Sequence, residues 1–220
     1  GALAVVIRSL GLAIDNHPHT GSMRYHEDVP KIPAAAISTS DAELIHEYIV
    51  QHPNEDIEFV MEMDCRKLED KISYNVIGEI PGSSKAEKII TIGGHLDSWD
   101  TGEGAHDDGA GVIHCLEALR IFKALNYQPK HTIRVVFFMN EENGNMGGKT
   151  YAKLVKEDGE QHVAALESDR GGFAPRGFSC DGSEEHIEWL KSTAPLFKEY
   201  DLHLFEKGYG GVDIGPLKKE

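Results

Sequence analysis

One short run constrains the fold of this chain more than any other feature: residues 133–138 read IRVVFF. A strand with one face in water alternates apolar and polar side chains, whereas a strand covered on both faces is apolar almost throughout. Strands of the second kind are typical of sheets with helices on both sides, and from about Lys71 the chain alternates strand and helix patterns. The sequence therefore predicts an α/β fold with a doubly wound, mostly parallel (mixed) sheet flanked by helices.

This second part of the chain contains four expected strands and three expected helices. In the first helix apolar residues recur every three or four positions, Asp108 is placed to cap the start, and Cys115 lies among apolar residues that favour a core position. The expected strands span residues 73–80, 88–93, 132–139 and 163–168, and the expected helices span residues 108–125, 146–157 and 183–200.

The first part of the chain has a different, β-rich pattern. We expect residues 1–68 to be a partial domain and residues 69–220 to be a second, C-terminally truncated domain, since both ends of the chain interrupt a pattern that belongs to a larger protein. Ser40, with Glu43 three residues later, predicts a capping box for a helix through Tyr48. The expected strands of this part are residues 2–8, 34–38 and 56–63.

Composition excludes several classes of function. Lys and Arg total 22 against 37 Asp and Glu, a net charge of −15, so a role on nucleic acid or on an anionic membrane surface is not expected. No apolar run reaches the roughly 18 residues that span a bilayer. Three Cys without a CxxC pair exclude a disulfide scaffold and a Cys-rich zinc site, and 12 His remain beside the carboxylates as metal ligands.

Groups that can bind metal follow the expected strands at their carboxyl ends, where ligands bind in open α/β sheets. The segments are GHLDSWD at residues 94–100, NEEN at 140–143 and Asp169, with GAHDDG at 104–109 opening the first long helix. So many carboxylates at one edge would repel one another unless cations lie between them. A pair of divalent cations resolves the conflict and is typical of hydrolases that activate a bridging water.

The spacing of these groups suggests their roles. His95 and Asp97 are two apart on an extended chain and point to the same side, as suits a ligand His whose ring is oriented by a carboxylate. Asp107, at a helix start among small residues, is placed to bridge both ions. Adjacent Glu141 and Glu142 cannot point the same way, so one can bind metal while the other takes a proton from the water.

The motifs GGHLDSWD, GAHDDGAG, NEENG and ESDRGG, in this order between about residues 73 and 169, resemble those of the cocatalytic di-zinc exopeptidases. That family includes aminopeptidases and the plasma glutamate carboxypeptidase, or carboxypeptidase Q-like, branch, to which HLDSWD and ESD are most similar. Residues 1–68 resemble part of a protease-associated domain, on PHTGSMRY at residues 18–25 and the strand–helix unit at 33–48.

The resemblance implies a role for each candidate residue. His95 and Asp169 would bind one zinc ion, and Asp107 would bridge both ions with its peptide bond to Asp108 in the cis form. The remaining assignments are Glu142 as ligand of the second zinc, Glu141 as general base and Asp97 as the residue that orients His95. The implied activity is zinc-dependent hydrolysis of a peptide bond near a terminus of short peptides or dipeptides.

One departure from the family pattern concerns the second zinc. The family completes that site with a late His, and neither His186 nor His203 has the expected setting. We therefore expect the ligand to lie beyond Glu220, and the chain as given to retain the second metal poorly and to show little activity. The resemblance also implies a secreted, periplasmic or lysosomal location, a short peptide as the binding partner, and a homodimer.

Three alternatives stay open at this point. Residues 143–150 resemble a phosphate-binding loop, but GxxxxGK[ST] fails at Asn143, and Glu141 and Glu142 would repel phosphates. A non-catalytic binding module of the same fold would have no need of an intact Glu141. A glutaminyl-cyclase-like acyl transferase with one zinc is the third alternative, against which Asp107 and Glu142 beside His95 favour two metals.

Overall fold

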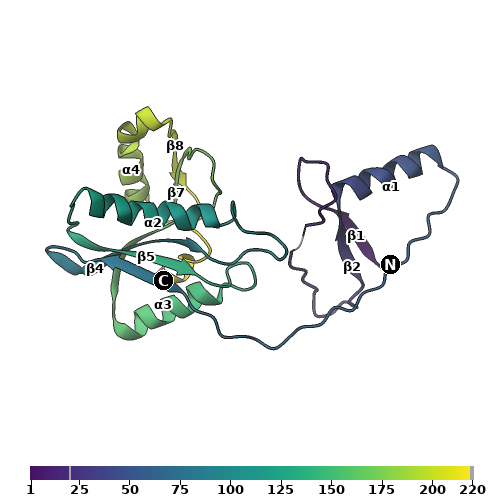
Figure 1. Ribbon diagram of the computed structural model, residues 1–220, viewed down its shortest axis with the longest axis horizontal. Helices are drawn as coiled ribbons and strands as arrows, with labels where there is room; N and C mark the ends of the chain where they lie inside the picture. The colour runs from purple at the N-terminus through teal and green to yellow at the C-terminus, as the bar shows by residue number, and fades with distance from the viewer. Residues whose placement is uncertain (20, 219–220) are drawn as a thin grey trace. The chain divides into compact units, whose positions relative to one another are not determined.

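A computed structural model describes residues 1–19 and 21–218 (Figure 1). Contacts divide the chain into two compact units, Gly1–Lys71 and Ile72–Glu220. Within the described residues, no helix is both long and apolar enough to cross a membrane. The identity of the first unit as a protease-associated-like domain stays a prediction.

The second unit is built on a four-stranded mixed sheet in the order β3-β5-β4-β6. β4 pairs in parallel with both β5 and β6, whereas β3 runs antiparallel to β5 at one edge. The predicted mixed α/β sheet with flanking helices is confirmed. The strands are β3 (Val76–Ile80), β4 (Lys85–His95), β5 (His131–Phe138) and β6 (Gln161–Glu167).

Two helices cover this sheet, α2 (Gly109–Ala124) on one face and α3 (Met146–Asp158) on the other (Figure 1). The run that predicted a doubly covered strand is β5, where Val136 and Phe138 have no exposed surface. Phe138 packs edge-on against Tyr151 of α3 at a centroid distance of 5.8 Å. Cys115 of α2 is buried, as its apolar neighbours predict.

Beyond the four-stranded sheet, β7 (Gly177–Cys180) and β8 (Leu204–Lys207) form a parallel pair that the sequence analysis did not find. The prediction of one helix over 183–200 is wrong: α4 (Glu184–Ser192) ends, and a 3-10 helix, η1 (Ala194–Tyr200), follows. Pro195 explains the break, because its ring has no N–H for an intrahelical hydrogen bond but is tolerated in the first turn of a new helix. A second short 3-10 helix, η2 (Gly215–Leu217), follows β8.

The first unit consists of a parallel strand pair, β1 (Val5–Arg8) and β2 (Ala34–Ile37), followed by α1 (Thr39–Gln51). The predicted capping box at Ser40 is wrong, because the N-cap is Ser38, whose side chain accepts the N–H of Asp41. The predicted strand at 56–63 is also wrong. An acidic and apolar alternation needs a neighbouring strand to pair with, and these residues have no ladder partner.

Candidate metal centre

Three parallel strands of the second unit end at one edge of the sheet, and each delivers candidate ligands there. β4 extends two residues beyond the predicted strand, so that His95 is its last residue, with 1% of its surface exposed. Asp169 lies two residues beyond β6, and Glu141 and Glu142 follow β5 after a short turn. Asp107 comes from the turn that leads into α2.

His95 is the centre of the cluster that these residues form. Its Nε2 lies 3.2 Å from Asp107 Oδ1, 3.3 Å from Asp169 Oδ1 and 3.9 Å from Glu141 Oε2. Two sets of groups lie close enough to share a cation, and both contain His95. The sets are His95 with Asp107 and Asp169, and His95 with Glu141 and Glu142.

The ring of His95 is oriented by Asp97, but through a different atom than the sequence suggested. Nδ1 donates a hydrogen bond to the main-chain carbonyl of Asp97 at 2.8 Å, which leaves Nε2 as the ring atom that faces the carboxylates. The Asp97 carboxylate lies 3.8 Å from the ring and instead accepts the main-chain N–H groups of Glu141 and Glu142, at 3.0 and 3.2 Å. Asp97 therefore ties the turn after β5 to the end of β4.

Asp108 caps the helix, as the sequence predicts, and also binds the main chain of His95. One carboxylate oxygen accepts the N–H of Gly111 in the first turn of α2, and the other accepts the N–H of His95, both at 3.0 Å. A side chain at Gly94 or Gly111 would strike this buried carboxylate. Burial, with the charge of Asp169, raises the pKa of Asp108 to about 7 against the lowering effect of its donors. The peptide bond between Asp107 and Asp108 is cis, as the resemblance implies.

The electrostatics of the cluster favour an added positive charge. Burial lowers the pKa of His95, but the hydrogen bonds to Asp169 and the Asp97 carbonyl and nearby negative charges outweigh it and raise the value to about 10. Burial, with the charges of Asp107 and Glu141, raises the pKa of Glu142 to about 7. Burial also raises the pKa of Glu141. A cation bound among these groups would offset the burial and repulsion that raise the pKa of Glu141 and Glu142.

The residues present fit a divalent cation of the zinc type. With bonds of about 2.0–2.1 Å in a tetrahedron, two ligand atoms on one zinc ion lie about 3.3 Å apart, which matches the distances from Nε2 to Asp107 and Asp169. Glu142 Oε1 is buried without a hydrogen-bond partner, an arrangement that a cation would satisfy. Within residues 1–19 and 21–218, no second His joins either set.

The two late histidines are occupied elsewhere. His186 completes a capping box with Ser183 at the start of α4, and His203 Nδ1 lies 3.1 Å from the carbonyl of Asp201. Neither belongs to a set of groups that could hold a metal. Bridging of two ions by Asp107 stays a prediction, because Asp107 belongs only to the first set.

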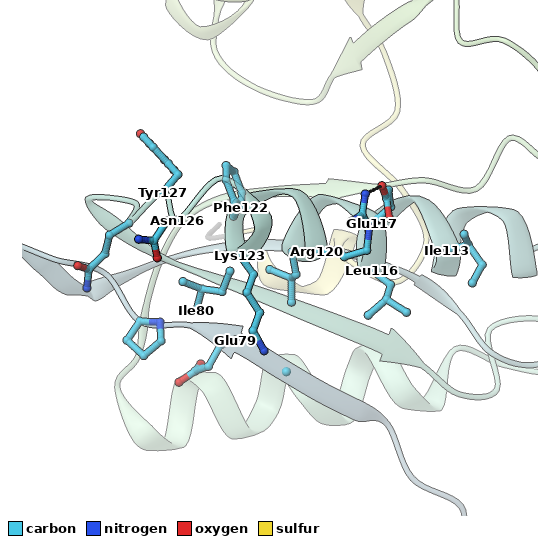
Figure 2. A pocket seen from close by; sticks show the side chains of 14 residues that line it. Glu79, Ile80, Ile113, Leu116, Glu117, Arg120, Phe122, Lys123, Asn126 and Tyr127 are labelled. Atoms are coloured by element: carbon cyan, nitrogen blue, oxygen red, sulfur yellow. Dashed lines mark hydrogen bonds and ion pairs between the residues drawn. The ribbon is translucent and has the colours of Figure 1, made fainter.

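A large groove of this unit lies away from the candidate ligands. It has a volume of about 1110 Å³ and lies between α2 and β3. Figure 2 shows side chains that line it, among them Ile80 of β3 and Ile113, Leu116 and Phe122 of α2. None of the candidate metal ligands lines this groove, so its volume alone would have misplaced the site.

Two residues near the metal centre were missed from the sequence. Glu167 ends β6, two residues before Asp169, which lies beyond the strand. Its position at a strand end, where the other candidates lie, could have found Glu167. Asp213 lies in the loop before η2 and is fully buried, but nothing in its sequence neighbourhood distinguishes it from a surface loop residue.

Known proteins resemble this chain over most of its length. The sequence profile of peptidase family M28 matches residues 75–217. Carboxypeptidase Q from Homo sapiens is 40% identical over 214 residues, which cover 97% of this chain and 45% of that protein. A probable leucine aminopeptidase 2 from Aspergillus oryzae is 37% identical over 161 residues, covering 67% of this chain and 29% of that protein.

A solved structure shares most of the fold. The crystal structure of a peptidase M28 precursor from Shewanella amazonensis SB2B superposes with a TM-score of 0.83 at 37% identity, covering 99% of this chain and 49% of that one. The chain thus spans about half the length of the relatives that it matches over nearly all its residues. On this evidence, the chain belongs to peptidase family M28.

Proposed function

We propose that this chain carries the metal-binding part of a zinc-dependent exopeptidase that hydrolyses a peptide bond near a terminus of short peptides or dipeptides. One observation carries the proposal: the Nε2 atom of a buried histidine faces carboxylates from two other segments at 3.2 and 3.3 Å. M28 membership and relatives that are named carboxypeptidase and aminopeptidase support the reaction class.

His95, Asp107 and Asp169 would hold one zinc ion, and Glu142 would contribute to a second, with Asp107 shared between them. Zinc at these positions would supply a Lewis acid for the scissile carbonyl and lower the pKa of a water molecule. Asp97 fixes the His95 ring through its carbonyl and, through its carboxylate, the main chain that carries Glu141 and Glu142.

Glu141 is proposed as the general base. Its side chain is 13% exposed, and burial raises its pKa, which brings a carboxylate closer to the neutral range in which proton transfer in both directions is efficient. Glu141 takes a proton from the attacking water and passes it to the leaving amine. Its backbone N–H donates to the Asp97 carboxylate, so the main chain that carries this side chain is fixed beside the candidate ligands.

Further parts of the proposal rest on the family resemblance. The first unit would be part of a protease-associated-like domain, and the protein would act in a secreted, periplasmic or lysosomal compartment, as a homodimer. A glutaminyl-cyclase-like acyl transfer is the competing activity, and its product differs from that of a peptidase.

The test combines zinc binding with digestion of a peptide library, with and without chelator. We expect one zinc ion to bind tightly and a second weakly, with low turnover, since no second His of the described residues joins the cluster. Glu141→Gln should keep the tight ion but lower turnover by about 10²–10⁴-fold, whereas Glu157→Gln, on the exposed face of α3, should change neither.

Two stoichiometric zinc ions with normal turnover would contradict the expected incomplete site. Turnover that resists chelation, or that Glu141→Gln leaves intact, would refute the peptidase mechanism. Cyclised amino-terminal glutamine among the products, without shortened peptides, would instead identify the acyl transferase.

A further inference from the structure

The segment Gly211–Ile214 is held by hydrogen bonds from two sides. Glu167, at the end of β6, accepts the N–H groups of Val212 and Asp213 at 2.8 Å and that of Ile214 at 3.0 Å. Asn145, in the turn that also carries Glu141 and Glu142, donates from Nδ2 to the carbonyl of Val212 at 2.6 Å. A short loop segment is therefore fastened to two of the strand ends that deliver metal ligands.

The segment packs closely at both of its ends. Gly211 has φ of +140°, and a Cβ there would lie 2.5 Å from the carboxylate carbon of Glu167. Ile214 anchors the other end in the core with Val136, Phe138 and Tyr151. The Glu167 carboxylate thus lies directly against the backbone of Gly211, where any side chain would collide with it.

Holding the segment in place buries a carboxyl group, and this unfavourable free energy must be offset by other contacts. Asp213 is fully buried, and neither of its carboxylate oxygens has a hydrogen-bond partner. Burial, with the charges of Glu167 and Glu141, raises the pKa of Asp213 to about 8. An unpaired buried carboxyl group is unfavourable, whereas three N–H groups on one carboxylate are strongly favourable.

We propose that Glu167 is a positioning residue of the metal centre: it clamps Gly211–Ile214 onto the strand end that leads to Asp169, and so fixes the buried Asp213 close to the candidate base Glu141. The role in the metal centre rests on the proposed function. The clamp itself rests only on the three hydrogen bonds, the burial of Asp213 and the close approach at Gly211.

The test follows amide hydrogen exchange residue by residue by NMR, in the whole chain, first without metal. Glu167→Gln keeps the shape of the side chain but removes its charge and one acceptor. We expect Val212, Asp213 and Ile214 to exchange about tenfold faster or more, because each loses a hydrogen bond to a charged group. Val135 and Val136 in β5 should exchange as before, and Glu157→Gln should change none of these amides.

Glu167→Asp separates reach from charge. It keeps the negative charge but withdraws the carboxylate by one methylene, so the same three amides should again exchange faster. If the three amides in Glu167→Asp exchange at the wild-type rate, the negative charge alone protects them, and the proposed clamp is overturned. Unchanged exchange in Glu167→Gln, or acceleration that is equal at Val135 and Val136, would also overturn it.

The second arm adds saturating zinc and measures its uptake. In the wild-type chain zinc should slow exchange at 212–214, because the segment borders the metal centre, and in Glu167→Gln this slowing should be lost. The positioning role is overturned if zinc binds without changing the exchange rates at 212–214. It is also overturned if zinc still slows exchange at these residues in Glu167→Gln. If no zinc binds, the proposed function fails, and the metal-free arm still decides the clamp.

Discussion

The two units of the chain are stabilised in different ways. In Ile72–Glu220 the sheet carries a core in which Val136 and Phe138 are fully buried. In Gly1–Lys71 the buried residues among those described are Ser9, Ser38 and Thr39, all of which carry hydroxyl groups, while Leu3 and Leu12 are 89% and 103% exposed. The hydroxyl of Ser9 donates to the carbonyl of Ile37, and that of Thr39 to Asp15.

The difference shows why the candidate site lies where it does. Ligands that repel one another need a rigid support. A buried sheet supplies one, because its close-packed core resists displacement of the strand ends. A unit that relies on hydrogen bonds and a two-stranded ladder has little such support, since a hydrogen bond contributes only about 1 kcal/mol net. Substitutions placed in one unit or the other separate the two experimentally.

The largest expected effect is the loss of a core side chain. Phe138→Ala should destabilise the second unit by about 3–5 kcal/mol, whereas Ile37→Ala in half-buried β2 should leave the same transition unchanged. Trp99 and Trp189 both belong to the second unit, so urea unfolding followed by tryptophan fluorescence reports on it. A comparable shift from both variants would show that the two units unfold together.

Zinc should sharpen the contrast, because its candidate ligands all come from one unit. At a free zinc concentration 100 times the dissociation constant, the second unit should gain about 2.7 kcal/mol, read from the same fluorescence transition. His95→Ala should abolish the gain, and His46→Ala, on exposed α1, should preserve it. Equal stabilisation of the His95→Ala variant would place the zinc elsewhere.

The sequence predicted the second unit better than the first, for a physical reason. A strand covered on both faces must be apolar throughout, so the pattern of β5 left little choice, and strand ends in a parallel sheet bring His95, Glu141 and Asp169 to one edge. In the first unit the acidic and apolar alternation of 56–63 looked like a strand, but pairing depends on a partner that local pattern does not contain.

Parts of the site were beyond reach of the sequence because they depend on tertiary contacts. The two-residue spacing of His95 and Asp97 indicated that Asp97 acts on His95, but whether a carbonyl or a carboxylate does so depends on the path of the chain after β4. Asp213 gave no signal, since burial of a loop carboxyl is decided by the segments that cover it. β7 and β8 were also missed, because they pair with each other in a ladder that neither local pattern contains.

Helix caps allow a matched comparison between the units, with a smaller effect. Ser38→Ala removes one hydrogen bond at the start of α1 and should cost about 1 kcal/mol. Asp108→Ala removes two buried hydrogen bonds, one of them to the main chain of His95, and should cost about 2 kcal/mol.

The readout is again urea unfolding, followed by fluorescence for Asp108→Ala and by exchange of the α1 amides for Ser38→Ala. Asp108→Ala should also weaken zinc binding, because the main-chain support of a ligand is lost. If Asp108→Ala binds zinc as tightly as the wild-type chain, its carboxylate serves only the helix.

The smallest expected effect is a pH dependence that only the second unit should show. Arg134, which is 14% exposed, donates to both carboxylate oxygens of Glu160 at 2.6 and 2.9 Å, and this contact lowers the pKa of Glu160 despite partial burial. A carboxyl group with a lowered folded-state pKa stabilises the fold above its ordinary pKa, and that stability is lost as the pH falls through the lowered value.

Glu160→Gln should therefore remove part of the acid sensitivity of the second unit, by less than about 1 kcal/mol because the pair is partly solvated. Glu43→Gln is the matched control in the first unit, since Glu43 and Arg8 lie 3.8 Å apart and are both well exposed. Denaturation at neutral pH and near the acid limit of stability measures the difference. A Glu160→Gln variant that loses stability in acid as steeply as the wild-type chain would show that Arg134 stabilises the sheet by packing and not by charge, and the electrostatic contrast between the units would then be confined to the metal centre.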